Sequence, residues 1–255
     1  MKRKLALITG GSGGIGASVA RLLAQDHDLA LGYASNQLRA EALKQEIECS
    51  HPNAEVRIFG GHLSGYEDAA ALAGNVKTEF GRAPEVLVTV TGGIYDKLFL
   101  GSDFACHQQL LNEHLTVTMA LCHLLLRDMY KLRFGRIVNI GSISARYSQR
   151  GQCSYSAAKA AIEAFSRTLA LEVAHRGITV NVVAPGLVHT DLTAPLIANI
   201  GATNGDLGRR IPVGVVGKPD DVGCLVRFLC SDQASYITGA VHTVDGGRSL
   251  GDPGS

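Results

Sequence analysis

Residues 9–16 read Thr9-Gly10-Gly11-Ser12-Gly13-Gly14-Ile15-Gly16, directly after an apolar run at 5–8 and at the start of a helical pattern. Glycine lets a chain turn tightly and lets backbone N–H groups approach a ligand closely. At a helix N-terminus such N–H groups favour an anion, above all a pyrophosphate. A glycine-rich stretch between the first strand and the first helix therefore predicts a cradle for phosphate groups.

Short apolar runs alternate with longer amphipathic segments along the whole chain. The runs are apolar on both faces, as parallel strands covered by helices are. They span residues 5–8, 29–33, 56–59, 86–90, 137–140, 178–183 and 241–244. Helical patterns lie at 14–25, 36–50, 65–80, 104–132, 152–176 and 219–230. This alternation predicts an α/β fold with a seven-stranded, doubly wound parallel sheet and helices on both faces. We expect one Rossmann-type domain over residues 1–247 and a C-terminal loop over 248–255.

The charge balance and the composition narrow the kinds of partner. Lys and Arg number 24 and Asp and Glu 23, so the net charge of +1 gives no reason to expect nucleic acid or a membrane. The hydrophobic fraction of 46% and the charged fraction of 18% exclude a disordered chain. No apolar run approaches the ~18 residues of a membrane span, and the run at 5–8 is too short for a secretory signal. A cytoplasmic protein is expected.

The six cysteines are scattered along the chain. None forms Cys-x-x-Cys, and none has a zinc-like spacing to the nine histidines. They are therefore expected to be buried, reduced thiols, and no metal site is predicted.

The spacing Thr-Gly-x-x-x-Gly-x-Gly at residues 9–16 resembles that of the short-chain dehydrogenase/reductase family. Similar segments, such as 181–190 and 236–247, extend the resemblance over nearly the whole chain. It implies a nicotinamide cofactor. The implied contacts are Gly10, Ser12, Gly13, Gly14, Ile15, Gly16, Tyr33, Ala34, Ser35, Asn36, His62, Leu63, Thr91, Gly92, Gly93, Tyr155, Lys159, Pro185, Gly186, Val188 and Thr190.

The end of the second predicted strand indicates which nicotinamide cofactor binds. NAD sites usually place Asp or Glu there, where it accepts a hydrogen bond from the ribose and repels a 2′-phosphate. No acid occurs at 29–40, and Arg39 lies nearby, which favours NADPH over NADH. NADP-dependent relatives often carry a basic residue before Gly14, where this chain has Gly13.

A tyrosine and a lysine lie four residues apart, at Tyr155 and Lys159, and so share one face of a helix. Ser142 stands thirteen residues before the tyrosine, after the strand predicted at 137–140. This Ser…Tyr-x-x-x-Lys pattern resembles the catalytic core of the family.

The chemistry of carbonyl reduction explains why a serine, a tyrosine and a lysine occur together. Hydride addition to a ketone leaves an alkoxide that needs a proton, and a free phenol with a pKa of about 10 is a poor acid. A cationic Lys159 and the oxidised nicotinamide are expected to lower the pKa of Tyr155, the general acid. Ser142 is expected to hold the carbonyl oxygen, and the resemblance assigns the nicotinamide ribose to Lys159.

Three segments depart from the family pattern. Residues 89–92 read Thr-Val-Thr-Gly where the family commonly has Asn-Asn-Ala-Gly, and His62 stands where an aspartate meets the adenine. His114 stands where the family has a fourth catalytic residue, an asparagine that holds a water linked to the lysine. A histidine can also bond a water or a carbonyl, so we predict a working relay with altered pH behaviour. The alternative is a histidine that only packs.

Within the family, residues 210–214, 217–222 and 232–239 most resemble 3-oxoacyl-[acyl-carrier-protein] reductases of fatty acid or polyketide synthesis. The resemblance implies reduction of a 3-oxoacyl thioester. Arg133 and Arg176 match the basic positions with which those reductases dock the acidic carrier protein, and opposite charges speed such an encounter. The alternative is two surface arginines without a partner.

Two other functions stay open. The fold hosts many substrates, and the partly apolar segment at 187–212 does not identify one, so a dehydrogenase of a small alcohol, sugar or steroid is the first alternative. A catalytically weakened assembly subunit is the second, suggested by the three departures and opposed by the intact serine, tyrosine and lysine. Relatives form homotetramers through the helices at 104–132 and 152–176 and the last strand, so a homotetramer is expected.

Overall fold

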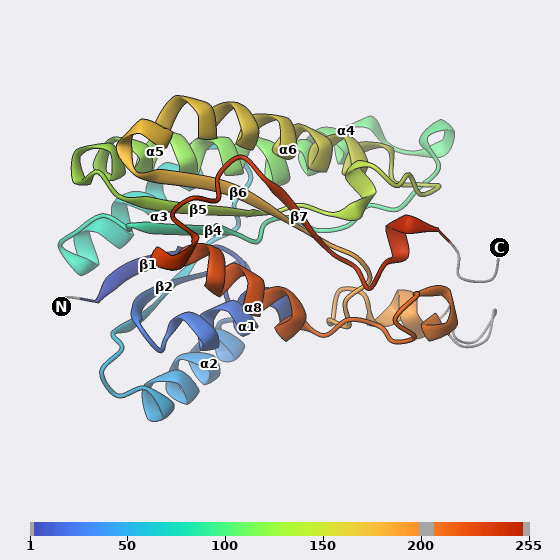
Figure 1. Cartoon of the computed structure of the whole chain (residues 1–255). Coiled ribbons are helices and arrows are strands. Elements are labelled where there is room, and N and C mark those ends of the chain that lie inside the picture. Colours follow the sequence, from blue (N-terminus) through green and yellow to red (C-terminus); the bar gives the residue numbers. More distant parts are fainter. Residues whose placement is uncertain (1–2, 199–206, 252–255) are drawn as a thin grey trace.

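The structure is a computed structural model that describes residues 3–198 and 207–251, arranged around one sheet (Figure 1). The strands are β1 (Lys4–Ile8), β2 (His27–Tyr33), β3 (Val56–Gly60), β4 (Val86–Thr89), β5 (Gly135–Ile140), β6 (Ile178–Pro185) and β7 (Val241–Val244). Every neighbouring pair is parallel, in the order β3-β2-β1-β4-β5-β6-β7. The predicted seven-stranded parallel sheet is confirmed.

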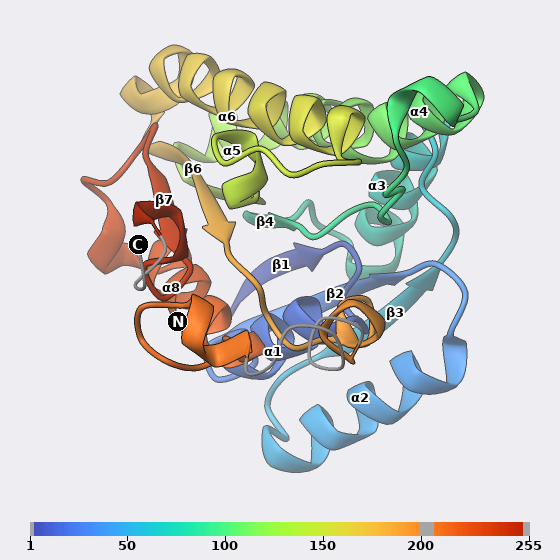
Figure 2. The same cartoon turned by 90° about the vertical axis from the view of Figure 1, so that its right-hand side faces the viewer.

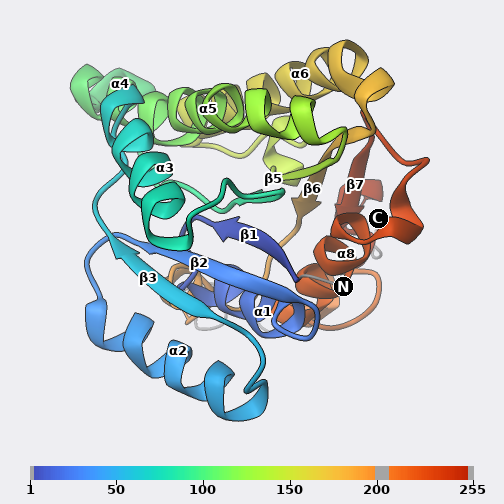
Figure 3. The same cartoon turned by 90° about the vertical axis from the view of Figure 1, so that its left-hand side faces the viewer.

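Helices cover both faces of this sheet (Figures 1 and 2). One layer holds α1 (Gly14–Leu23), α2 (Gln37–Ser50) and α8 (Pro219–Cys230). The other holds α3 (Tyr66–Phe80), α4 (Phe104–Leu111), α5 (Val117–Leu132) and α6 (Cys153–Val173). Seen from the β3 edge, α2 and α3 lie on opposite sides of the sheet (Figure 3). Two cores of buried apolar side chains result, one on each face, which explains why the strands read as continuous apolar runs.

One predicted helix differs in a way that matters for the site. Segment 104–132 is not a single α-helix, because a π-helical turn at Asn112–Thr116 separates α4 from α5. Such turns re-aim the side chains they carry and are frequent at functional sites, and this one carries His114. Short 3-10 turns lie at Ala174–Arg176, after α6, and at Arg248–Leu250, within the tail expected to be a loop.

The strand order reverses at β1, which lies between β2 and β4. In open α/β sheets a crevice forms at such a point, outside the carboxyl ends of the strands, and ligands bind in it. The glycine-rich turn after β1 and the segments after β2, β4 and β5 all reach this edge of the sheet. The topology therefore brings together the segments that carry the predicted site residues.

Candidate active site

The glycine-rich turn connects β1 to α1 and opens onto the crevice. Gly10 has a φ of +57°, and a Cβ atom there would lie 2.2 Å from the carbonyl oxygen of Val90. A Cβ on Gly16 would lie 2.1 Å from the carbonyl oxygen of Gly10, so both positions need glycine. Gly13 caps α1 without a side-chain hydrogen bond, and the first turn of α1 carries no acid. The backbone N–H groups at this helix end therefore suit the phosphates of a dinucleotide.

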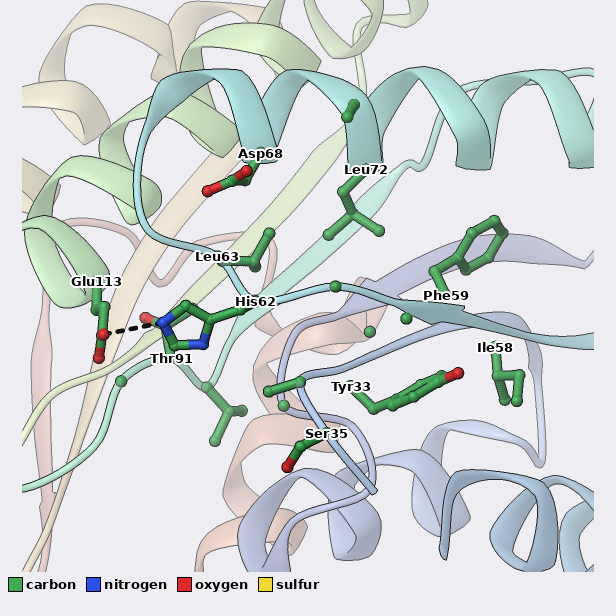
Figure 4. A pocket seen from close by; sticks show the side chains of 18 of the residues that line it. Tyr33, Ser35, Ile58, Phe59, His62, Leu63, Asp68, Leu72, Thr91 and Glu113 are labelled. Carbon is green, nitrogen blue, oxygen red and sulfur yellow. Dashed lines mark hydrogen bonds and ion pairs between the residues drawn. The ribbon is translucent and has the colours of Figure 1, made fainter. Parts of the chain in front are cut away.

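The crevice contains two adjoining cavities. The larger, of about 820 Å³, reaches past the ends of β2 and β3 (Figure 4) and is lined by the expected contacts Gly10, Tyr33, Ala34, Ser35, His62, Leu63, Thr91, Gly92 and Gly93. The smaller, of about 140 Å³, is lined by Ile15, Thr91, Gly92, Gly93, His114, Ser142, Tyr155, Lys159, Pro185, Gly186, Val188 and Thr190. Ser12 and Gly14 line a neighbouring depression with Thr190, while Gly13 is the N-cap of α1, Gly16 lies in the first turn of α1 and Asn36 caps α2. This lining fits the implied cofactor contacts, which stay predictions.

The end of β2 carries no carboxylate of its own. Ser35 lines the larger cavity. Asn36 caps α2, and its side chain accepts a hydrogen bond from the backbone N–H of Arg39 at 2.9 Å. The Arg39 guanidinium forms an ion pair with Asp191, in the segment after β6. A hydroxyl and a cation thus lie where the adenosine ribose of a dinucleotide is expected.

Ser142, Tyr155 and Lys159 meet in the smaller cavity. Ser142 begins a 3-10 turn after β5, and its Oγ accepts a hydrogen bond from the N–H of Ser144 at 3.1 Å. Tyr155 and Lys159 lie one turn apart on α6, with the lysine Nζ 5.6 Å from the centre of the tyrosine ring. Nζ donates to the carbonyl oxygen of Ile140 at 2.8 Å. The structure therefore brings together the three residues predicted from their spacing.

Burial changes the proton affinity of both titratable groups. It lowers the pKa of Lys159 to about 7, so the ammonium charge is present below about pH 7. It raises the pKa of Tyr155, an effect that the hydrogen bond with Ser142 opposes and the charge of Asp96 reinforces. The expectation that Lys159 and the oxidised nicotinamide together lower this pKa stays a prediction for the protein with cofactor bound, since burial sets the direction without it and the lysine Nζ is bonded to Ile140. The phenol is therefore protonated at neutral pH, but the raised pKa makes it a weaker acid than a free tyrosine.

His114 lies in the π turn, 2% exposed, with its ring edge-on to Tyr155 at a centroid distance of 5.4 Å. Burial and the charge of Lys159 lower its pKa to about 3, so the imidazole is neutral at ordinary pH. Its Nε2 therefore donates to the carbonyl oxygen of Gly93 at 2.9 Å. Nδ1 is then a buried acceptor without a partner among the described residues. Titration of His114 therefore does not produce the expected change in pH behaviour. Its unpaired Nδ1 is placed to accept a hydrogen bond from a water.

The altered segment after β4 fits this histidine. The hydroxyl of Thr89 donates to the Asn139 side chain at 2.8 Å inside the sheet, which supplies a contact where the family has an amide. Gly92 has a φ of +87°, and a Cβ there would lie 2.1 Å from Nε2 of His114. The two departures from the family pattern, at residues 89–92 and at His114, therefore pack together, because the glycine at 92 leaves room for the histidine ring.

Two polar clusters beside the site have no motif of their own. Gln152 donates to Asp96 at 3.1 Å and accepts from the Ser144 hydroxyl at 3.0 Å, which connects the segment after β4 to the turn that carries Ser142. Glu113 pairs with His62 at 3.0 Å across the larger cavity. In the sequence, these clusters are indicated only by position. Gln152 lies three residues before Tyr155, and Glu113 lies next to His114.

Arg133 and Arg176 lie at the ends of α5 and α6 that point away from the crevice. Arg133 ends α5 with a φ of +53°, and the Arg176 guanidinium stacks over the Tyr130 ring at 4.0 Å. A Cβ on Gly177 would lie 2.6 Å from the carbonyl oxygen of Arg133, so the two segments are adjacent. Because α6 has 21 residues, roughly 30 Å of helix lies between them and Tyr155. Their docking role stays a prediction.

A phosphate cradle at one end of the crevice and a tyrosine–lysine pair beside a serine at the other suit an extended dinucleotide and a carbonyl compound. This arrangement defines an NAD(P)-dependent oxidoreductase that interconverts a ketone and an alcohol. A family model described as enoyl-(acyl carrier protein) reductase matches residues 10–249. The chain belongs to the short-chain dehydrogenase/reductase family.

Known relatives span the whole chain. The chain is 37% identical over 250 residues to the 3-oxoacyl-[acyl-carrier-protein] reductase FabG of Haemophilus influenzae, covering 98% of this chain and 100% of that one. It is 36% identical over 247 residues to the acetoacetyl-CoA reductase of Shinella zoogloeoides, covering 96% and 98%. Among solved structures, YwfH, an NADPH dependent reductase involved in bacilysin biosynthesis, superposes with a TM-score of 0.89 at 27% identity, covering 97% and 98%.

Within the described residues, no helix has the length and apolar character needed to cross a membrane.

Proposed function

We propose that the protein uses NADPH to reduce a 3-oxoacyl thioester, carried on acyl carrier protein, to the 3-hydroxyacyl form in fatty acid or polyketide-type synthesis. The observation that carries the proposal is the convergence of Ser142, Tyr155 and Lys159 on a small cavity that adjoins the cofactor crevice. Relatives named as 3-oxoacyl-[acyl-carrier-protein] reductase and acetoacetyl-CoA reductase support a 3-oxoacyl substrate.

The side chains act on the substrate carbonyl in distinct roles. The Ser142 oxygen already accepts from Ser144, so its own O–H donates to the carbonyl oxygen, where negative charge develops. Tyr155, kept protonated by burial, donates the proton that the new alcohol requires. The Lys159 ammonium holds the ribose hydroxyls of the cofactor. The bound cofactor supplies the hydride.

NADPH is favoured by the groups at the end of β2. The strand ends without an acid that would repel a 2′-phosphate, and Ser35 and Arg39 supply a hydroxyl and a cation. Arg39 is paired with Asp191, so a 2′-phosphate would compete with that carboxylate for the guanidinium. The NADPH-dependent relative of known structure supports the same preference.

A panel of cofactors and substrates tests the proposal. Turnover is measured with NADPH and NADH on acetoacetyl carrier protein, acetoacetyl-CoA, and free ketones including a sugar and a steroid. We expect kcat/KM to be about tenfold higher or more with NADPH, and highest for the carrier-bound thioester. Faster turnover with NADH would overturn the cofactor assignment. Turnover of small ketones alone would favour the first alternative, and no NADPH oxidation with any thioester would favour a weakened assembly subunit.

Docking of the acidic carrier protein is assigned to Arg133 and Arg176. Since these lie roughly 30 Å of helix away from Tyr155 of the same chain, we propose that the carrier serves the site of a neighbouring copy in a homotetramer. An apolar groove between α5 and α6, which includes Met119, supports such an assembly.

Replacing both arginines by glutamine should lower kcat/KM about tenfold on the carrier-bound thioester and leave a free ketoester unchanged. Glutamine keeps the aliphatic stem of Arg176 on Tyr130 and removes only the charge. Steady-state kinetics on both substrates measure the difference. Equal losses on both substrates would show that the arginines stabilise the fold and do not dock the carrier.

His114 is proposed to hold a water with its bare Nδ1, and two variants separate this role from packing. His114→Phe keeps a ring against Tyr155 but has no acceptor, so kcat should fall about tenfold, the cost of one hydrogen bond. His114→Asn loses the ring but supplies an amide acceptor, and should keep kcat within about threefold. The pH–rate profile of each variant from pH 5 to 8 should keep the shape of that of the unmodified protein, because His114, with a pKa of about 3, does not titrate in this range. If the Phe variant is the more active of the two, the residue only packs.

A further inference from the structure

The larger cavity is where the adenine of a bound dinucleotide must lie. The phosphates belong at the turn after β1, and the reacting end belongs beside Tyr155 in the smaller cavity. The adenosine half therefore extends the other way, past the end of β2 and into the space bounded by the segments after β3 and β4. Figure 4 shows that a side chain pair, His62 and Glu113, closes one end of this space.

This pair joins two distant segments. His62 follows β3, and Glu113 lies in the π turn between α4 and α5. The His62 Nε2 lies 3.0 Å from Oε1 of Glu113, and the Gln109 side chain donates to the same oxygen at 2.7 Å. Glu113 is buried and His62 is exposed to the cavity. The Glu113 carboxylate is thus held in place by Gln109. The His62 imidazole is the part of the pair that can contact a ligand in the cavity.

The carboxylate decides which nitrogen of His62 carries the proton. An ionised carboxylate only accepts hydrogen bonds, so Nε2 must donate to it. In a neutral imidazole the other nitrogen, Nδ1, is then a bare acceptor. No group of the described residues hydrogen-bonds to Nδ1, and Figure 4 shows it on the side of the cavity where Tyr33 and Ser35 lie.

We propose that Glu113 is a positioning residue that holds His62 in the Nε2–H form, so that the cavity selects a purine with an amino group at C6 over one with an oxygen there. This inference rests on the proposed function. An amino group donates to the bare Nδ1, whereas a C6 oxygen would face it lone pair to lone pair. The analogue therefore forgoes a hydrogen bond that NADPH makes, which lowers its affinity relative to NADPH.

The test compares binding of NADPH with that of its hypoxanthine analogue, in which oxygen replaces the C6 amino group. Fluorescence of the reduced nicotinamide is titrated under the same conditions for every ligand and variant. The unmodified protein should bind NADPH about tenfold more tightly than the analogue. Glu113→Gln, whose amide can also donate to Nε2 and so permits the other tautomer, should bring the two dissociation constants within about twofold of each other.

Two controls keep the result specific. Glu67→Gln removes a negative charge at the exposed start of α3 without touching His62, and should keep the tenfold preference. Reduced nicotinamide mononucleotide, which has no adenosine, should bind the protein and Glu113→Gln alike. Equal binding of the two dinucleotides by the unmodified protein, or a preserved preference in Glu113→Gln, would overturn the inference and leave the proposed function standing. Absence of binding of either dinucleotide would overturn both.

Discussion

Tyr155→Phe should lower kcat for thioester reduction by about 10³-fold and leave the Kd for NADPH within about threefold. The substitution removes one oxygen and keeps the ring that packs against His114. Without the phenol, the group proposed to protonate the reduced oxygen is gone. The phosphates and the adenosine of the cofactor are proposed to bind elsewhere in the crevice, so its affinity should survive. Oxidation of NADPH and fluorescence titration measure the two quantities separately.

Tyr236→Phe is the matched control, because Tyr236 is fully exposed at 101% and does not line the crevice. It should change neither kcat nor Kd. If Tyr155→Phe retained more than about a tenth of kcat, another group would have to supply the proton, and the assignment of Tyr155 would fail.

That Ser142, Tyr155 and Lys159 share one cavity could be predicted because each lies at a short, regular distance from the end of an element. Ser142 comes two residues after the end of β5, and Tyr155 and Lys159 share one face of α6. The glycine-rich turn likewise lies between β1 and α1. Parallel strands then bring all these element ends to one edge of the sheet, so local patterns were enough to assemble the site.

The parts that could not be predicted depend on contacts between distant segments. The π turn interrupts a run of residues whose spacing is that of an ordinary helix, so no local pattern marks it. The contact between His62 and Glu113 joins positions 51 apart, and that between Asp96 and Gln152 joins positions 56 apart. Residue spacing also does not report burial, so the rise in the pKa of Tyr155 in the protein without cofactor could not be predicted.

Gly10→Ala should lower the free energy of unfolding by about 3 kcal/mol and abolish NADPH binding. The φ of +57° lies in the left-handed region, and a Cβ would lie 2.2 Å from the carbonyl oxygen of Val90. That oxygen belongs to the backbone, so relief requires a shift of the turn or of the segment after β4. Both line the crevice, and a shift of either disturbs the phosphate cradle. Thermal unfolding should show a fall in Tm of about 6–12 °C.

Gly74→Ala is the control, because it replaces a glycine by alanine without changing the turn after β1. Gly74 lies inside α3, and a Cβ there would meet no atom within 4 Å. Alanine favours a helix interior over glycine by about 1 kcal/mol, so this variant should raise Tm slightly and leave NADPH binding unchanged. If Gly10→Ala instead kept the Tm and the NADPH affinity of the unmodified protein, the turn would tolerate a side chain. The cradle would then not depend on close backbone approach, and the phosphates would have to be held by side chains such as Ser12 and Arg39.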